Sequence, residues 1–214
     1  MHPAGAFQAG REAALRIARA HPFAAVGVAA GAGLAGLQTP LIPVFGADGE
    51  VAAFEGHFAR ANRAYEALAG RDAAPALAVF SGPDAYVSPS SYASKADGGR
   101  VVPTWNYVSA EAEGTLTLVE DAAATRAILD RQAAVYEAGQ VEPWATAHAP
   151  ADYIAALLRA IVGLRLDVTR FEATEKLSQN KAGADFDGVL RALEARGELG
   201  ARGVAARMRE LERG

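Results

Sequence analysis

Residues 22–47 contain no charged side chain, and this stretch limits what the chain can fold into more than any other feature. On length alone, such a stretch would span a bilayer as a helix. Five glycines and three prolines interrupt it, however, and such residues are typical of turns between short strands. We therefore predict two strands, over residues 23–30 and 34–45, joined by a turn at 31–33. Pro40 and Pro43 should place the second strand at a sheet edge or in a bulge.

Composition excludes several other classes of protein. The chain has 214 residues, 51% of them hydrophobic, which suits one ordinary domain, with or without appendages. A net charge of −4 argues against coating nucleic acid or anionic lipid by bulk charge, and the lack of cysteine excludes disulfides and thiolate metal sites. The N-terminal charges have no signal-peptide layout. We expect a soluble, cytoplasmic protein without membrane attachment.

The rest of the chain alternates between apolar strand-like segments and amphipathic helices. Strands are predicted over 51–58, 75–81, 101–119 and 161–174, and helices over 8–20, 59–70 and 121–138 and from 151 onward. Residues 82–100 are rich in serine, glycine and proline and indicate a long ordered loop. Two charged helices follow residue 185, joined by a turn at 197–200. Hairpins without strict strand–helix alternation favour a small antiparallel barrel over a doubly wound parallel sheet.

Two of the four polar clusters in the chain offer donors for an anion. Residues 56–62 join a predicted strand to a predicted helix, where backbone N–H groups, Arg60 and Asn62 suit a phosphate. A helix cap with solvated charges is the alternative. Ser88, Ser90 and Lys95 suit phosphate or ribityl contacts. The alternative there is a surface loop held by serine turns.

The other two clusters lie on or just after predicted strands. Trp105 and Tyr107 share one face of their strand, which we expect to be aromatic core. Thr104 and Asn106 on the opposite face would then be available to a flat heterocycle. Residues 175–181 follow a strand, and by themselves they are typical of a polar loop.

Taken together, these segments resemble the PaiB family of FMN-binding negative transcriptional regulators. The resemblance rests on five segments in the family's order: HFARAN at 57–62, GPDAYVSPS at 82–90, VPTWNY at 102–107, IVG at 161–163 and KLSQN at 176–180. It implies an α+β fold, a mostly antiparallel split β-barrel of about six strands with peripheral helices, similar to pyridoxamine-phosphate oxidases. It also implies a homodimer that binds FMN between its protomers.

The resemblance implies that the segment from His57 to Asn62 binds the flavin phosphate and that Thr104 to Asn106 lie beside the flavin ring. The segment from Lys176 to Asn180 would also reach the flavin site. One way for it to do so is from the partner protomer of the dimer. Two positions depart from the family pattern, because Ser91 and Glu175 stand where relatives usually carry aromatic residues, so we expect an opened pocket that holds FMN weakly. The residues expected to contact the cofactor are His57, Arg60, Asn62, Ser88, Ser90, Lys95, Thr104, Trp105, Asn106, Lys176, Ser178, Gln179 and Asn180.

Three functions follow from this resemblance. The first is transcriptional repression through a flavin- or ligand-bound dimer, and the second is an FMN-dependent oxidoreductase related to pyridoxamine-phosphate oxidases, without direct DNA binding. The third is a dimeric barrel that has lost FMN and binds another small ligand. The best candidate for direct DNA contact is the C-terminal helical pair. Its arginines alternate with glutamates, however, and this pattern is typical of a solvated or dimer-packing surface. We place a split-barrel domain at 1–182 and a helical extension at 183–214.

Overall fold

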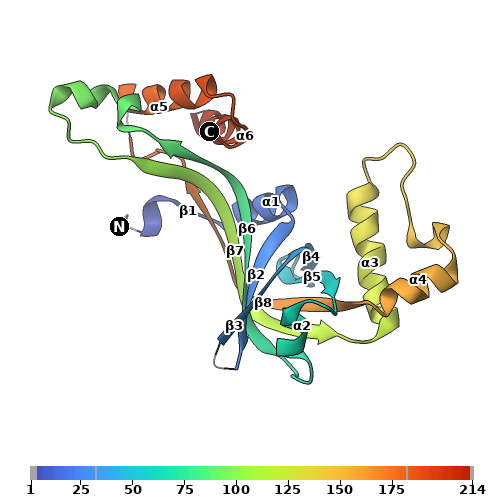
Figure 1. The fold of residues 1–214 in the computed structure, drawn as a ribbon. Coiled ribbons are helices and arrows are strands. Elements are labelled where there is room, and N and C mark those ends of the chain that lie inside the picture. The colour runs from blue at the N-terminus through green and yellow to red at the C-terminus, as the bar shows by residue number, and fades with distance from the viewer. Residues whose placement is uncertain (1–3, 32, 182, 213–214) are drawn as a thin grey trace. The chain divides into compact units, whose positions relative to one another are not determined.

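A computed structural model describes residues 4–31, 33–181 and 183–212, and Figure 1 shows their fold. Contacts within the chain group these residues into two compact units. Unit 1 takes the described residues of Met1–Ile17, Ser81–Ala110 and Glu172–Gly214, and unit 2 takes those of Ala18–Phe80 and Glu111–Phe171. The division of the chain at residue 182, expected from the sequence, stays a prediction.

Strands and helices alternate irregularly along the described residues. The strands are β1 (Gln8–Ala9), β2 (Phe23–Ala30), β3 (Gly33–Pro40), β4 (Ile42–Phe45), β5 (Val51–Ala59), β6 (Ala74–Val87), β7 (Thr104–Val119) and β8 (Ile161–Lys176). The α-helices are α1 (Arg11–Ala20), α2 (Arg63–Leu68), α3 (Ala122–Glu137), α4 (Ala151–Leu158), α5 (Ala184–Ala195) and α6 (Leu199–Glu212). Short 3-10 helices are η1 (Ala4–Ala6), η2 (Pro89–Ser91), η3 (Ala93–Asp97) and η4 (Thr146–His148). None of the helices in the described ranges is long and apolar enough to cross a membrane.

One antiparallel sheet gives the α+β fold that the sequence predicts. Its strand order is β3-β2-β6-β7-β8-β5-β4, with β1 added to β8, and β6, β7 and β8 each run through both units. The described sheet has eight strands instead of about six, and its path ends at β3 and β4 without closing. The count rises because β1 was not expected and because the predicted strand 34–45 is interrupted at Leu41.

The prolines of this interrupted segment lie where the sequence places them. Pro40 ends β3, and Pro43 lies in β4, so both belong to the two edge strands of the sheet. The pairing of β4 with β5 also shifts register between Val44 and Phe45, which is the predicted bulge. Gly31 adopts a left-handed φ of 63° at the predicted hairpin turn, while Ala32 of that turn lies outside the described residues.

Phenylalanines from three strands form the centre of unit 2. The ring of Phe54 on β5 lies 4.9 Å from that of Phe80 and 5.3 Å from that of Phe171, in tilted and edge-on arrangements. All three side chains are buried. Aromatic pairs at these distances add to the stabilisation from apolar burial.

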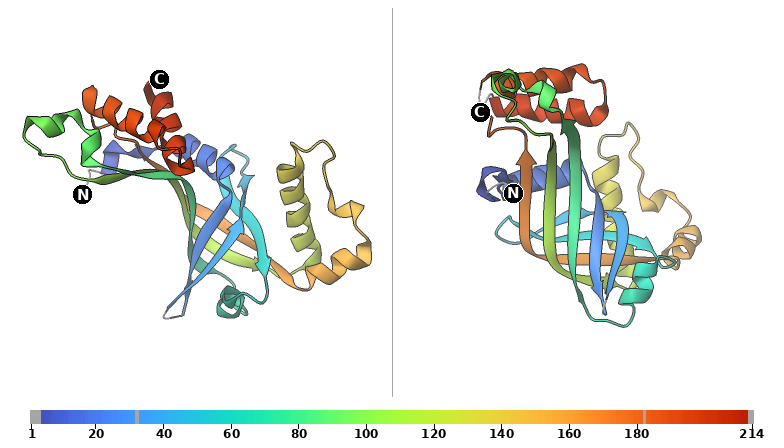
Figure 2. Two further views of the ribbon diagram at one scale, coloured as in Figure 1. Left: turned by 45° about the horizontal axis from the view of Figure 1, so that its top comes forward. Right: turned by 60° about the vertical axis from the view of Figure 1, so that its left-hand side comes forward.

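In unit 1, helix α6 packs against one face of β7. Figure 2 shows α5 and α6 side by side, as their mutual contacts require. Val108 and Ala110 of β7 and Met208 of α6 are buried, and the amide of Asn106 lies 3.8 Å from the Met208 sulfur. Trp105 on the opposite face is 54% exposed. The prediction that Trp105 and Tyr107 form the core face is therefore wrong, because α6 packs on the face that carries Asn106.

Candidate functional site

Unit 1 contains a cleft of about 210 Å³ where the start of β7 lies next to the end of β8. We call it the cationic cleft, because Arg100, Lys176 and Lys181 all line it and none of its described lining residues is acidic. Its other polar side chains are hydroxyls and amides, which complement an anion that needs several donors. The full lining comprises Tyr92, Arg100, Val101, Val102, Pro103, Thr104, Asn106, Lys176, Ser178, Asn180 and Lys181.

The two lysines of the cleft are positioned by neighbouring side chains. The ammonium of Lys176 donates a hydrogen bond to the hydroxyl of Thr104, across from β8 to β7. Burial lowers the pKa of Lys176, since desolvation disfavours its charged form. The ammonium of Lys181 lies 5.1 Å from the centre of the Tyr92 ring, a cation–π contact. The carboxylate of Asp185 interacts electrostatically with Lys181 and Tyr92, so an anion in the cleft would compete with this carboxylate for Lys181.

A buried pair of side chains fixes the turn that follows β8. Asn106 donates to the Ser178 hydroxyl at 2.9 Å, and that hydroxyl lies 3.2 Å from the Asn106 carbonyl oxygen. Ser178 has a φ of 63°, a left-handed conformation that costs free energy for a residue other than glycine. The buried pair opposes this cost, and it holds the backbone of residues 176–180 along the cleft.

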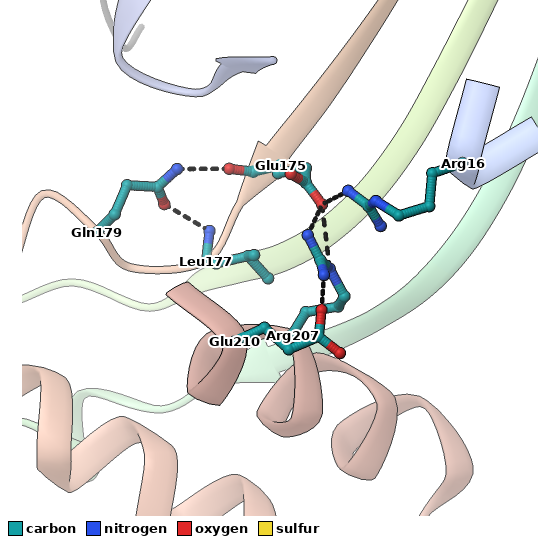
Figure 3. A network of polar contacts seen from close by, with 6 residues as sticks. All are labelled: Arg16, Glu175, Leu177, Gln179, Arg207 and Glu210. Atoms are coloured by element: carbon teal, nitrogen blue, oxygen red, sulfur yellow. Dashed lines mark hydrogen bonds and ion pairs between the residues drawn. The ribbon is translucent and has the colours of Figure 1, made fainter. Parts of the chain in front are cut away.

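Gln179 closes the same turn from outside the cleft (Figure 3). Its side-chain oxygen accepts from the backbone N–H of Leu177 at 2.7 Å, and its amide nitrogen donates to the backbone carbonyl of Glu175 at 2.5 Å. Gln179 is absent from the described lining of the cleft. Its observed role is to hold the turn, and its predicted contact with FMN stays a prediction.

Glu175 stands where the sequence departs from the family pattern that it resembles. Its side chain is buried and is the centre of an ion-pair network whose outer members are partly exposed (Figure 3). Its carboxylate accepts from Arg16 of α1 at 2.9 Å and from Arg207 of α6 at 2.7 Å. Burial alone would raise the pKa of Glu175, but the hydrogen bonds and charges of the two arginines outweigh it and lower the pKa. Arg207 also pairs with Glu210. Glu175 therefore forms an ionic link among α1, β8 and α6.

The first predicted cluster lies in unit 2, where its side chains bind other parts of the chain. Asn62 caps α2 by accepting from the backbone N–H of Ala64 at 2.9 Å, which is the cap alternative weighed from the sequence. Arg60 donates to the carbonyl of Ile161 at 2.9 Å and pairs with Glu120 at 2.6 Å. The hydrogen bond that Arg60 donates to the Glu120 carboxylate is the main reason that the pKa of Arg60 is raised.

His57 of the same cluster lines a different cavity in unit 2. Its Nδ1 lies 2.7 Å from the side-chain oxygen of Gln132, and the nitrogen of that amide donates to the carbonyl of Pro40 at 2.8 Å. The roles of His57, Arg60 and Asn62 at a flavin phosphate remain predictions.

The loop residues singled out from the sequence lie outside the described lining of the cationic cleft. Ser88 caps η2 and its hydroxyl lies 2.8 Å from that of Ser90, as the serine-turn alternative predicts. Lys95 is exposed on η3, and Ser91 is half-buried on η2. Trp105 lies on the other face of β7, with its ring edge-on to Tyr86.

The structure thus brings together five of the predicted residues and adds three further polar or charged residues, Tyr92, Arg100 and Lys181. Thr104, Asn106, Lys176, Ser178 and Asn180 share the cleft. Tyr92 and Lys181 belong to polar segments already recognised in the sequence, although no role was assigned to them. Arg100 was missed, and its place beside the glycines that end the predicted loop gave no signal of a ligand contact.

Solved structures of flavin-binding proteins share this fold. The FAD- and heme-binding protein from Mycobacterium smegmatis matches with a TM-score of 0.58 at 18% identity, over 90% of this chain and 82% of that one. The flavocytochrome Anf3 from Azotobacter vinelandii matches with a TM-score of 0.54 at 18% identity, over 81% of this chain and 68% of its own. The fold is therefore the split barrel of flavin-binding proteins, as the sequence resemblance implies.

Residues 1–170 match the family described as "Putative FMN-binding domain", and this chain belongs to that family. The protease synthase and sporulation protein PAI 2 of Bacillus subtilis is 30% identical over 145 residues, which are 65% of this chain and 63% of that protein. An uncharacterized protein of Aspergillus fumigatus is 34% identical over 150 residues, which are 63% of this chain and 58% of that one. The chain thus spans about three fifths of the length of these relatives. The match confirms the predicted family and its cofactor, FMN.

Proposed function

We propose that the cationic cleft binds the phosphate end of FMN. The observation that supports this most directly is the charge of the cleft, in which Arg100, Lys176 and Lys181 face a space without described acidic lining. Phosphate is matched by such a set of ammonium, guanidinium and hydroxyl donors. FMN would supply redox chemistry to the protein when bound.

The size of the cleft defines which part of FMN it suits. Pockets that enclose a whole small-molecule ligand measure roughly 300–1,000 Å³. At about 210 Å³ the cleft suits the phosphate and the adjoining ribityl hydroxyls better than the flavin ring. In this arrangement Lys176 neutralises the phosphate, Thr104 holds the Lys176 ammonium, and Asn180 is available to a ribityl hydroxyl.

Riboflavin provides the test, because it lacks the phosphate of FMN but keeps the ring and the ribityl chain. In fluorescence titrations, Lys176→Met should weaken FMN binding about tenfold to a hundredfold, the cost of one charge-assisted hydrogen bond, and should leave riboflavin binding unchanged. Lys95→Met is the matched control, since Lys95 is an exposed lysine outside the cleft. Equal losses for both ligands, or equal losses in both variants, would refute the assignment.

We further propose that the protein is a PaiB-type negative regulator of transcription and that it acts as a homodimer. The identity with PAI 2 of Bacillus subtilis supports the regulatory family, and the open edges of the sheet favour association of protomers. Light scattering should give twice the chain mass of 22.2 kDa at micromolar concentration. A monomer mass would contradict the dimer.

We propose that this regulation does not use the C-terminal helices to contact DNA. Arg209 pairs with Glu194 at 2.7 Å and Arg196 with Glu198 at 2.5 Å, while Arg207 binds the buried Glu175. These pairs neutralise the charges that a phosphate backbone would need. Fluorescence anisotropy with duplex DNA should detect no binding at micromolar protein and physiological salt, and salt-dependent binding there would contradict the proposal.

A further inference from the structure

A second cavity lies in unit 2, where α3, α4 and the segment joining them face β5 and the start of β8 (Figure 1). Its volume is about 410 Å³, within the range of small-molecule sites. Leucine, isoleucine and alanine side chains form most of its wall, and the rings of Tyr136 and Trp144 complete it. None of the described residues that line it is an acid, a lysine or an arginine.

His57 is one of the few polar groups in this wall, and its hydrogen-bond partner fixes the tautomer of the neutral ring. The Gln132 amide nitrogen donates to the carbonyl of Pro40 at 2.8 Å, so the amide oxygen faces the His57 ring. That oxygen lies 2.7 Å from Nδ1 and can only accept, so Nδ1 carries a proton. In the neutral ring Nε2 is then the acceptor.

The acceptor Nε2 is available to a ligand. Among the residues that the structure describes, no hydrogen bond is formed by Nε2, and no buried side-chain nitrogen or oxygen lacks a partner. Nε2 is therefore accessible rather than sealed in the core. A ligand in the cavity that donates one hydrogen bond would find a fixed acceptor on a wall that is otherwise largely apolar.

We infer that this cavity is a second binding site, for a small, neutral, aromatic molecule that donates one hydrogen bond to His57. The aromatic walls and the volume suit a planar ring system. Charged molecules are excluded, because the described lining offers no opposite charge to offset their desolvation. The inference goes beyond FMN binding, because every residue it uses lies in unit 2 whereas the cationic cleft lies in unit 1.

The test uses two neutral probes, 2-naphthol and 2-methoxynaphthalene. The second carries a methyl group in place of the hydroxyl hydrogen and so cannot donate a hydrogen bond. Calorimetric titration should show that 2-naphthol binds about twofold to tenfold more tightly, the worth of one neutral hydrogen bond. His57→Phe keeps a planar ring but removes the acceptor, so it should abolish this preference. A preference that survives in His57→Phe, or binding of neither probe, would overturn the inference.

The two tryptophans of the chain provide a matched pair of variants that leaves His57 intact. Trp144, 44% exposed, lines the cavity, whereas Trp105, 54% exposed, lies outside it in unit 1. Trp144→Ala should weaken both probes, and Trp105→Ala should weaken neither. Equal effects of the two variants would contradict the site. Displacement of 2-naphthol by riboflavin would assign the cavity to the flavin ring and would also overturn the inference. The cationic cleft is tested separately, by comparing FMN with riboflavin in the Lys176→Met variant.

Discussion

Replacement of Glu175 by glutamine should destabilise unit 1, although the two side chains have nearly the same shape. Glu175→Gln removes the negative charge and leaves Arg16 and Arg207 facing a neutral amide. Loss of one partner from a fully buried ion pair costs about 3–5 kcal/mol. Here the side chains of Glu175 and Arg207 are 10% and 19% exposed, but that of Arg16 is 43% exposed and is screened by water. We therefore expect a loss of roughly 2–3 kcal/mol in the free energy of unfolding.

The loss should depend on pH in a direction that the pKa of Glu175 sets. That pKa is lower in the folded protein than the ordinary value of 4.5, so the folded state favours the carboxylate. The stabilisation is fully present above about pH 4.5 and is lost as the pH falls through the folded pKa. The wild type and the variant should therefore differ most near neutral pH and converge in acid.

Urea unfolding followed by the fluorescence of Trp105 provides the assay, in a Trp144→Phe background so that the signal comes from unit 1. Glu113→Gln is the control, because the carboxylate of Glu113 also binds an arginine, Arg170, but the pair is exposed. This control should change stability little. If Glu175→Gln unfolds at the same urea concentration as the wild type, or if its deficit is the same at every pH, the account of the network is wrong.

Three further substitutions test other parts of the structure. Phe54→Ala should lower the free energy of unfolding by about 3–5 kcal/mol in thermal or urea unfolding, since it empties a fully buried aromatic site; a loss below 1 kcal/mol would contradict this. Gly188→Ala should lower the free energy of unfolding by about 1–3 kcal/mol, because the new Cβ would lie 2.1 Å from a carbonyl oxygen of η2. Gly197→Ala is the control and should change this free energy little, because no atom lies within 4 Å of the new Cβ. Lys181→Met should weaken FMN binding in fluorescence titrations more than Lys95→Met, because Lys181 lines the cationic cleft whereas Lys95 is exposed outside it; equal dissociation constants would contradict that ranking.

Local signals predicted both ends of α3 and the start of α4 well. Asp121 caps α3 by accepting from the backbone N–H of Ala124, and α4 begins directly after Pro150. The end of β6 was misjudged, because distant pairing outweighed local sequence. Gly82 and Pro83 suggested the start of a loop, yet β6 continues to Val87, with Gly82 packed closely against Val108 of β7. Helix α2 is shorter than predicted, because residues 60–62 form a turn after β5 and Asn62 caps the helix.

The cationic cleft could be predicted in part, because its members occur in two short polar segments. The pattern could not show that Lys176 and Thr104 meet across two strands, since strand register is a long-range property. Nor could it identify the covered face of β7, because Trp105 and Tyr107 have the larger apolar side chains while α6 packs on the other face. Which face a helix covers depends on the whole topology.

The turn from Lys176 to Asn180 also affects how costly it is for the cleft to bind a ligand. Asn106 and Gln179 hold this turn through hydrogen bonds within the chain, so its backbone is ordered before any anion arrives. Association then loses less conformational entropy than it would if a flexible loop had to be ordered on binding. The free-energy cost of the left-handed φ at Ser178 arises when the chain folds, so it does not reduce the affinity of the cleft for an anion. An anion should therefore bind this cleft by rigid docking, with little movement of the backbone.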